Sequence, residues 1–254
     1  MSGALRVLEG HLVTYRGTWR GSVTSTFLNP VLFLSAMGLG LGSLVDRGDG
    51  LGEISYLAFY ASGLLAAQAM QTGVGDATYP VMAGMKWLKT YDAALATPVT
   101  TRDLVFGQAS FILLRITLAS TVFAVVAAVF GAFPAARGLT AVPVVLLGGL
   151  AYALPVMAFT GSLERETALA GLFRFGVVPM FLLSGTFFPV EQLPIVLQQV
   201  ARAVPLWHTI EVVRAITLRD PSTWPLAVHV GYLLVWTLVG GVLAVGVFRR
   251  RLVT

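Results

Sequence analysis

Long apolar runs recur along this chain, and short polar segments separate them. A helix needs about 20 apolar residues to cross the hydrocarbon core of a bilayer. Only 11% of the residues are charged, whereas soluble domains carry about 25%. So few charges cannot solvate the surface of a water-soluble protein of 254 residues. The sequence therefore predicts an all-α, polytopic membrane protein whose single transmembrane domain covers residues 1–254.

We expect six transmembrane helices, near residues 25–45, 54–78, 104–133, 139–163, 168–188 and 224–248. The second is rich in small residues, which let helices approach closely in lipid. The third is long enough to tilt. The fourth contains Pro143 and Pro155 and is expected to kink. A polar turn at residues 46–50 is expected to separate the first two spans.

Two segments have helical periodicity but are not expected to span. Residues 4–22 predict an amphipathic helix in the interface, since apolar residues recur there at spacings of three and four (Leu5, Leu8, Leu12, Tyr15 and Trp19). Residues 190–220 contain two pieces, near 191–203 and 206–219, bounded by prolines. Both are too short and too polar to span, so we expect re-entrant or interfacial helices on the outer side.

Residues 82–103 form a polar segment between two apolar runs. Strong helix formers lead up to Pro98, which predicts a helix over residues 82–98 that ends near Thr97. Lys86 and Lys89 accompany the aromatic residues Trp87 and Tyr91. Such a helix suits docking to a soluble partner, and the alternative is an ordinary cytoplasmic loop.

The distribution of lysine and arginine predicts the orientation. With the N-terminus inside, the inner segments carry eleven basic residues, the outer segments carry five, and Arg115 is the seventeenth. The positive-inside rule then favours six spans with both termini in the cytoplasm. Arg6, Glu9 and Arg16 interrupt what would be the apolar core of a signal peptide, so we expect the spans themselves to direct insertion.

Arg115 falls within the third expected span. An arginine at this depth is costly and is a candidate functional residue. Three alternatives remain open: it snorkels to the cytoplasmic interface, it pairs with Asp76, or it pairs with Glu166.

Few residues suggest catalysis. The chain has no GxxxxGK[ST] motif, and no cysteine to form a disulfide or a thiolate metal site. His208, Glu211 and Arg214 share one stripe of an expected outer helix. They are a weak metal site, and a solvated polar face is the alternative. The net charge of +5 is attributed to loops at an anionic membrane surface, which argues against a nucleic-acid partner.

Four segments together resemble one family. They are the N-terminal amphipathic helix, residues 56–66 of the second span, residues 86–98, and the run Ser184-Gly185-Thr186-Phe187-Phe188-Pro189 followed by Pro194, Pro205, His208, Glu211 and Arg214. The sequence is similar to the membrane subunits of type-2 ABC exporters, such as lipooligosaccharide (nodulation-factor type) and daunorubicin-type permeases. It departs from many relatives at Ser62, where they have proline, and at Asp76, where they have glutamate.

The resemblance implies a permease that works as a homodimer or with a paralogue, served by two copies of a separate ATP-binding subunit. ATP and Mg²⁺ would bind to that subunit, and no cofactor is expected in this chain. Residues 82–98 would be the coupling helix, with the coupling residues Lys86, Trp87, Lys89, Thr90, Tyr91 and Asp92. The pathway or outer gate would include Phe181, Gly185, Phe187, Phe188, Pro189, Trp207, His208, Glu211 and Arg214. The aromatic members of that second set either line the route or anchor the chain at the bilayer interface.

The function implied is ATP-driven export of an amphipathic or lipid-linked substrate across a bacterial cytoplasmic membrane. Two alternatives of other classes remain. One is a membrane-embedded, lipid-modifying enzyme that uses His208, Glu211 and Arg214. The other is a membrane anchor that holds a soluble partner without transporting anything.

Overall fold

The chain folds as a bundle of helices. The computed structural model describes residues 2–42 and 54–253, with only the backbone at residues 22–27, 39 and 41. Its elements are α1 (Gly3–Phe33), η1 (Leu34–Leu41), α3 (Tyr56–Ala77), α4 (Tyr79–Met82), η2 (Ala83–Trp87), α5 (Thr90–Leu95), α6 (Thr101–Val129), α7 (Ala135–Ser162), α8 (Thr167–Gly171), η3 (Leu172–Val177), α9 (Val178–Leu183), η4 (Val190–Gln192), α10 (Ile195–Arg202), α11 (Pro205–Thr217) and α12 (Leu226–Leu252). No strand occurs in these ranges, which confirms the all-α prediction for them.

Within the part of the chain that the structure describes, three helices are long and apolar enough to cross a membrane: α6, α7 and α12. They correspond to the third, fourth and sixth expected spans. Helix α3 has 22 residues but is less apolar, because glutamines and small residues occupy much of it. The fifth expected span is a shorter apolar helix, Thr167–Leu183. It ends five residues before the predicted end, because the chain turns at Gly185 with a positive φ of 87°.

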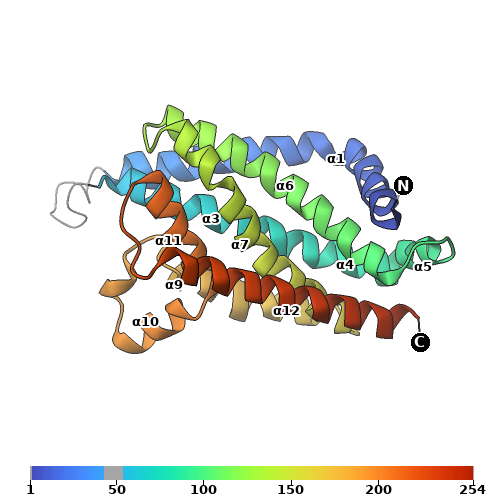
Figure 1. Cartoon of the computed structure of the whole chain (residues 1–254). Helices are drawn as coiled ribbons and strands as arrows, with labels where there is room; N and C mark the ends of the chain where they lie inside the picture. The colour runs from blue at the N-terminus through green and yellow to red at the C-terminus, as the bar shows by residue number, and fades with distance from the viewer. Residues whose placement is uncertain (1, 43–53, 254) are drawn as a thin grey trace.

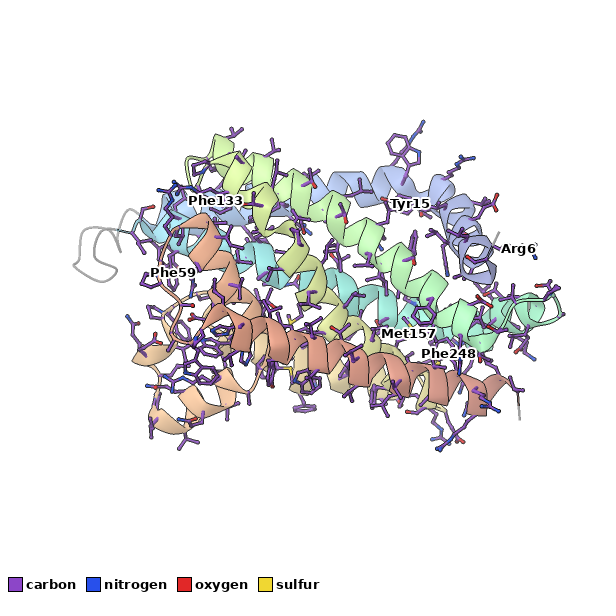
Figure 2. The ribbon with its side chains drawn as sticks, in the orientation of Figure 1. Arg6, Tyr15, Phe59, Phe133, Met157 and Phe248 are labelled. Atoms are coloured by element: carbon purple, nitrogen blue, oxygen red, sulfur yellow. The ribbon has the colours of Figure 1, made fainter. Side chains whose placement is uncertain are left out.

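The N-terminal segment differs from its prediction. An interfacial helix over residues 4–22 and a span beginning near residue 25 were expected to be separate, but α1 is continuous from Gly3 to Phe33. Figure 2 shows that α1 bends near Tyr15, so that the part carrying Arg6 runs in another direction. Pro30 lies inside this helix, which passes directly into the π-helix η1. The end of the first expected span and the turn at residues 46–50 lie outside the described residues.

The expected helix over residues 82–98 is also not continuous. The backbone runs from α4 into the π-helical turn η2 and then breaks, because Lys89 adopts a left-handed conformation with a φ of 50°. The separate short helix α5 follows and ends at Leu95, close to the predicted end. Lys86 and Trp87 therefore belong to η2, whereas Tyr91 and Asp92 belong to α5.

The two ends of the bundle carry different features. Figure 1 shows both termini and α5 at one end, and α10 at the opposite end. The two short helices predicted within residues 190–220 are present as α10 and α11, with boundaries close to those expected. The basic residues Arg249, Arg250 and Arg251 occupy the last turn of α12, at the same end as α5.

Close packing of α7 against α12 depends on a glycine. Pro155 lies inside the continuous helix α7, and Gly240 of α12 lies directly against its ring. A Cβ atom on Gly240 would lie 2.7 Å from the Pro155 backbone nitrogen, a distance that no flexible side chain can relieve. The glycine thus allows α12 to approach the backbone of α7 at its proline.

We expect Gly240→Ala to lower the free energy of unfolding by roughly 1–3 kcal/mol, because the added methyl group overpacks this contact. Gly246→Ala is the matched control on the same helix, since a Cβ at Gly246 would meet no atom within 4 Å. Both changes gain the same helix propensity, up to about 1 kcal/mol. Thermal unfolding in detergent, followed by circular dichroism, should rank Gly240→Ala below the wild type and Gly246→Ala at or above it. Equal melting temperatures for the two variants would contradict this packing argument.

Candidate functional site

An exposed basic and aromatic surface lies at the end of the bundle that carries both termini. Trp87 is 52% exposed and Leu88 69% exposed, although both are large apolar residues. Lys89, Thr90 and Asp92 are also exposed. Lys86 lies beside them, and its Nζ donates to the backbone oxygen of Glu164 in the loop before α8. We call residues Lys86, Trp87, Leu88, Lys89, Thr90 and Asp92 the η2–α5 surface.

Tyr91 faces inward from the η2–α5 surface and is buried. Its ring covers Gly84, where any Cβ atom would lie about 3 Å from the ring carbons, and its centroid is 5.7 Å from that of Phe248. The hydroxyl group donates to Oε1 of Gln108 at 3.3 Å. Burial raises the pKa of Tyr91 above its usual value, so the hydroxyl group keeps its proton at physiological pH and remains a donor.

Helix α6 begins beside this surface with a capping box. Thr100 accepts a hydrogen bond from the Asp103 backbone N–H, and Asp103 accepts one from the Thr100 N–H at 2.9 Å. This start fixes the register of α6, and so the positions of Gln108 and Arg115 along it.

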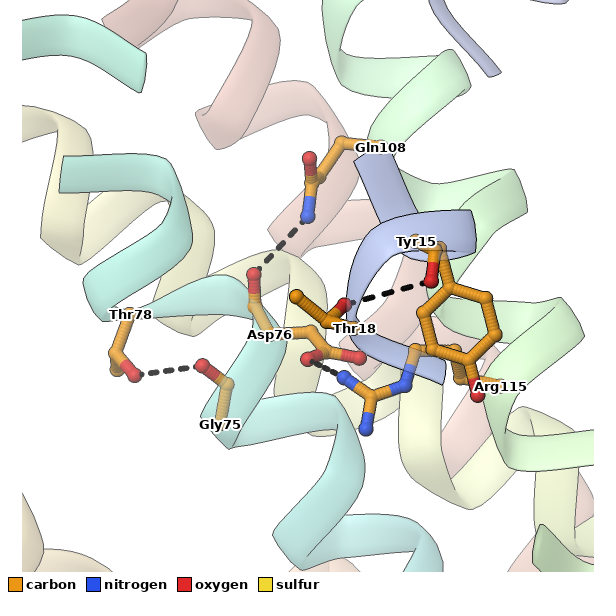
Figure 3. A network of polar contacts seen from close by, with 7 residues as sticks. All are labelled: Tyr15, Thr18, Gly75, Asp76, Thr78, Gln108 and Arg115. Carbon is orange, nitrogen blue, oxygen red and sulfur yellow. Dashed lines mark hydrogen bonds and ion pairs between the residues drawn. The ribbon is translucent and has the colours of Figure 1, made fainter. Parts of the chain in front are cut away.

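A line of polar contacts runs inward from Tyr91 along α6. Figure 3 shows its inner part, from Gln108 through Asp76 to Arg115. Gln108, which accepts from Tyr91, donates through Nε2 to the backbone oxygen of Asp76 at 3.0 Å. The Asp76 carboxylate accepts from Nη1 of Arg115 and forms an ion pair with it. Arg115 lies near the middle of the 29-residue α6. The η2–α5 surface is thus connected to a charge pair deep in the bundle.

The structure decides among the alternatives left open for Arg115. It pairs with Asp76, and its guanidinium group lies 5.9 Å from the ring centroid of Tyr15 on α1. Glu166 is not its partner. The sequence analysis placed Tyr15 on the apolar face of an N-terminal helix but did not connect it with Arg115, and it did not single out Gln108. Periodicity along one helix does not show which side chain of another helix it will contact.

A hollow of about 460 Å³ separates the N-terminal part of α1 from α5. Arg6 and Thr90 lie on its rim, and Val7, Tyr91 and Leu104 contribute apolar lining. His11, which stacks on Phe111 of α6, also lines it. The N-terminal part of α1 and α5 therefore border one hollow, which has room for a side chain.

At the opposite end of the bundle, some of the predicted outer residues come together. The buried Arg214 donates through Nη2 to the backbone oxygen of Gly185 at 2.6 Å, and its guanidinium group lies 3.7 Å from the ring centroid of Phe59. Phe187 packs against Phe181, with centroids 5.0 Å apart, and its backbone oxygen accepts from Tyr56. These contacts hold the turn after α9 against the first turns of α3. Phe188 and Pro189 are half-buried in the same turn.

We expect Gly185→Ala to destabilise this turn. Alanine at a φ of 87° is strained, and its Cβ would lie 3.0 Å from Val190. The expected loss is about 1–3 kcal/mol in the free energy of unfolding. Gly131→Ala is the control, since its φ is 79° but no atom lies within 4 Å of its Cβ. Thermal unfolding should place Gly185→Ala below Gly131→Ala. The reverse order would show that Gly185 is not held against Val190.

The remaining outer residues form a separate aromatic cluster. His208 Nε2 donates to the Arg202 backbone oxygen at 3.0 Å, so its Nδ1 accepts from Nδ1 of His229 at 2.9 Å. Trp207 packs on Trp224, and Tyr232 stacks on His208. The sequence analysis did not connect His229 with His208, because 21 residues separate them and they lie on different helices.

The three groups proposed for an enzyme do not converge. His208 is engaged with Arg202 and His229, Arg214 with Gly185, and Glu211 accepts from the Thr223 backbone N–H at 2.8 Å. Within residues 2–42 and 54–253, no group of three metal-ligating side chains could hold an ion. The three side chains on this stripe therefore each hold a different part of the fold.

Comparison with known proteins identifies the family. The model of the ABC-2 type transporter family matches residues 8–218. Nodulation protein J of Rhizobium meliloti (strain 1021) is 36% identical over 231 residues, which cover 91% of this chain and 87% of that protein. Nodulation protein J of Rhizobium leguminosarum bv. viciae is 32% identical, with 98% of this chain and 94% of that protein covered. The probable multidrug ABC transporter permease YbhR of Escherichia coli (strain K12) is 29% identical over 64% of this chain and 44% of that protein. The predicted resemblance is confirmed, and the chain belongs to the ABC-2 type transporter family.

Proposed function

We propose that the chain is the membrane-spanning subunit of an ATP-driven exporter. Two copies of a separate ATP-binding subunit hydrolyse ATP, and two permease subunits, either two copies of this chain or one copy with a paralogue, form the path. The proposed topology has six spans in a bacterial cytoplasmic membrane, with both termini in the cytoplasm and α10 and α11 re-entrant on the outer side.

One observation carries the proposal: the η2–α5 surface is exposed, aromatic and basic, and Tyr91 connects it to the centre of the bundle. A large exposed apolar side chain such as Trp87 beside lysines is typical of a protein interface. Closure of the ATP-binding subunits would push on this surface. The rigid contact of Tyr91 with Gln108 and Phe248 would carry the displacement into α6 and α12. The two states would differ in these contacts, as a ligand-driven shift requires.

The proposed substrate is an amphipathic or lipid-linked molecule, such as a glycolipid, a lipooligosaccharide or a drug-like amphiphile. The similarity to proteins named nodulation protein J supports a glycolipid or a lipooligosaccharide. The similarity to a probable multidrug permease supports a drug-like amphiphile. The segment around Gly185, Phe187 and Arg214 is the proposed outer gate. Its turn is buried at Gly185 and half-buried from Phe187 to Pro189, and it is joined to other helices by the hydrogen bonds of Arg214 and Tyr56, at the end opposite the η2–α5 surface.

The test is purification of the tagged chain from native membranes in a mild detergent, followed by an assay for bound ATPase activity. A soluble ATP-binding subunit in equal amount to the permease is the expected result. Absence of such a subunit across several detergents would overturn the proposal and revive the enzyme alternative, which predicts lipid-modifying activity of the chain alone and its loss in His208→Ala.

A further inference from the structure

A polar hollow of about 210 Å³ lies between α1, α3 and α6, beside the Asp76–Arg115 pair. Its polar and aromatic lining consists of Tyr15, Asn29, Gln68, Gln71, Thr72 and Arg115. The depth of the hollow follows from Arg115, which lies near the middle of α6, a helix long and apolar enough to cross the membrane. The hollow therefore opens at the level of the hydrocarbon core.

Lipid hydrocarbon cannot form hydrogen bonds with the polar side chains that line this hollow. Gln71 is exposed and Gln68 is half-buried, and neither amide makes a hydrogen bond to another described residue. A polar group left without a hydrogen-bond partner in a bilayer core is strongly unfavourable. Three amides gathered on one hollow at this depth indicate that a polar group occupies it during part of the working cycle.

The charges of the hollow select the kind of group. Arg115 is compensated by Asp76, so the pair adds no net charge, and the other lining groups are neutral. A ligand with an anionic headgroup would therefore gain little electrostatic attraction in this hollow, and its charge would lie near the Asp76 carboxylate. Amide side chains both donate and accept hydrogen bonds, which matches hydroxyl and amide groups. The ring of Tyr15, on which Arg115 lies, adds an aromatic wall.

The size of the hollow limits what enters. Pockets for drug-sized ligands measure roughly 300–1,000 Å³, and this hollow is smaller. It can take one polar unit of a larger molecule, whose apolar part would remain outside in the lipid. A single sugar residue has the required size, hydroxyl groups and neutrality.

We propose that this hollow binds one neutral, hydroxyl- or amide-bearing unit, such as a sugar residue, of the amphiphile that the protein exports. The assignment of this unit to an exported molecule rests on the proposed function. The binding site itself rests on the amides of Gln68, Gln71 and Asn29 beside the neutralised Arg115.

The same geometry connects the hollow with the η2–α5 surface. A ligand on Arg115 would contact one member of the pair, and Asp76 is joined through Gln108 to Tyr91. Occupancy of the hollow is thereby expected to change the ATPase activity of the bound partner.

The test uses two photoreactive probes with the same alkyl chain, one with a glucose head and one with a phosphate head. The purified chain is placed in lipid nanodiscs free of sugar-headed detergent, and the crosslinked peptides are mapped by mass spectrometry. The glucoside should label α1, α3 and α6 saturably, and the phosphate should not. Gln68→Leu/Gln71→Leu should reduce glucoside labelling about tenfold. Gln199→Leu, the same change on the exposed face of α10, should leave it unchanged.

Equal labelling by the two probes, or full labelling of the double variant, would overturn the site. A second copy of the chain is the rival occupant. If the double variant changes the oligomeric state in native mass spectrometry but keeps its labelling, the hollow is a subunit interface and the proposal fails.

Co-purification of the ATP-binding subunit is measured on the same samples. Specific glucoside labelling of a chain that binds no ATP-binding subunit would overturn the export function, and the bound sugar unit could then not be assigned to an exported molecule. If only the binding site is wrong, labelling is lost but the ATP-binding subunit still co-purifies.

Discussion

Replacing Asp76 by alanine is expected to lower the free energy of unfolding by about 3 kcal/mol, because it leaves Arg115 without its counter-ion inside the bundle. Removing one member of a buried pair typically costs about 3–5 kcal/mol, and we take the lower end because the Arg115 side chain is 29% exposed. Export should be lost as well, since the substitution removes the ion pair that joins α3 to Arg115 on α6, although the backbone oxygen of residue 76 can still accept from Gln108. Thermal unfolding in detergent and export by membrane vesicles measure the two effects.

A double-mutant cycle measures the coupling between Asp76 and Arg115 apart from the other contacts of each residue. Asp76→Ala/Arg115→Leu should recover much of the stability, because no uncompensated charge remains, but it should not recover export. Asp92→Ala is the control for loss of an aspartate: this residue is exposed on α5 and should change stability by less than about 0.5 kcal/mol. If the double variant were no more stable than Asp76→Ala, the two charges would not be coupled.

Replacing Trp87 by alanine is expected to weaken binding of the ATP-binding subunit by about 2 kcal/mol, roughly 30-fold in Kd, without unfolding the permease. An exposed tryptophan at an interface is a typical energetic hot spot. Because Trp87 is 52% exposed, its removal leaves no large cavity. Titration of the partner onto the permease in nanodiscs gives the affinity, and the coupling of ATP hydrolysis to export follows from vesicle assays.

Trp236→Ala is the matched control for this change. Trp236 is 39% exposed on α12, away from the η2–α5 surface, so its loss should leave partner affinity unaltered. Tyr91→Phe removes only the hydroxyl group that donates to Gln108. It should keep the partner bound but lower the export achieved for each ATP hydrolysed. Wild-type affinity and export in both Trp87→Ala and Tyr91→Phe would refute the coupling role of this surface.

The ends of helices were only partly predictable from the sequence. The end of α5 followed from Pro98, whose clash with the preceding residue is local. The break at Lys89 did not, because lysine has no preference for a left-handed φ. On the far side of the break, the ring of Tyr91 packs against Gly84, a contact that the sequence does not reveal. Likewise, the sequence does not reveal that Arg214 donates to Gly185 in the turn after α9, because the two residues lie 29 positions apart.

Composition and hydropathy by themselves determined that this chain is a helical membrane protein. Long apolar segments with so few charges are stable as helices in lipid but not in water. Local residue strings also determined the family and the exposed segment around Trp87. The tertiary structure alone decided which polar groups meet: Asp76 with Arg115, Gln108 with Tyr91, and His208 with His229. Those pairs join different helices, and periodicity along one helix carries no information about the rotation and depth of its neighbour.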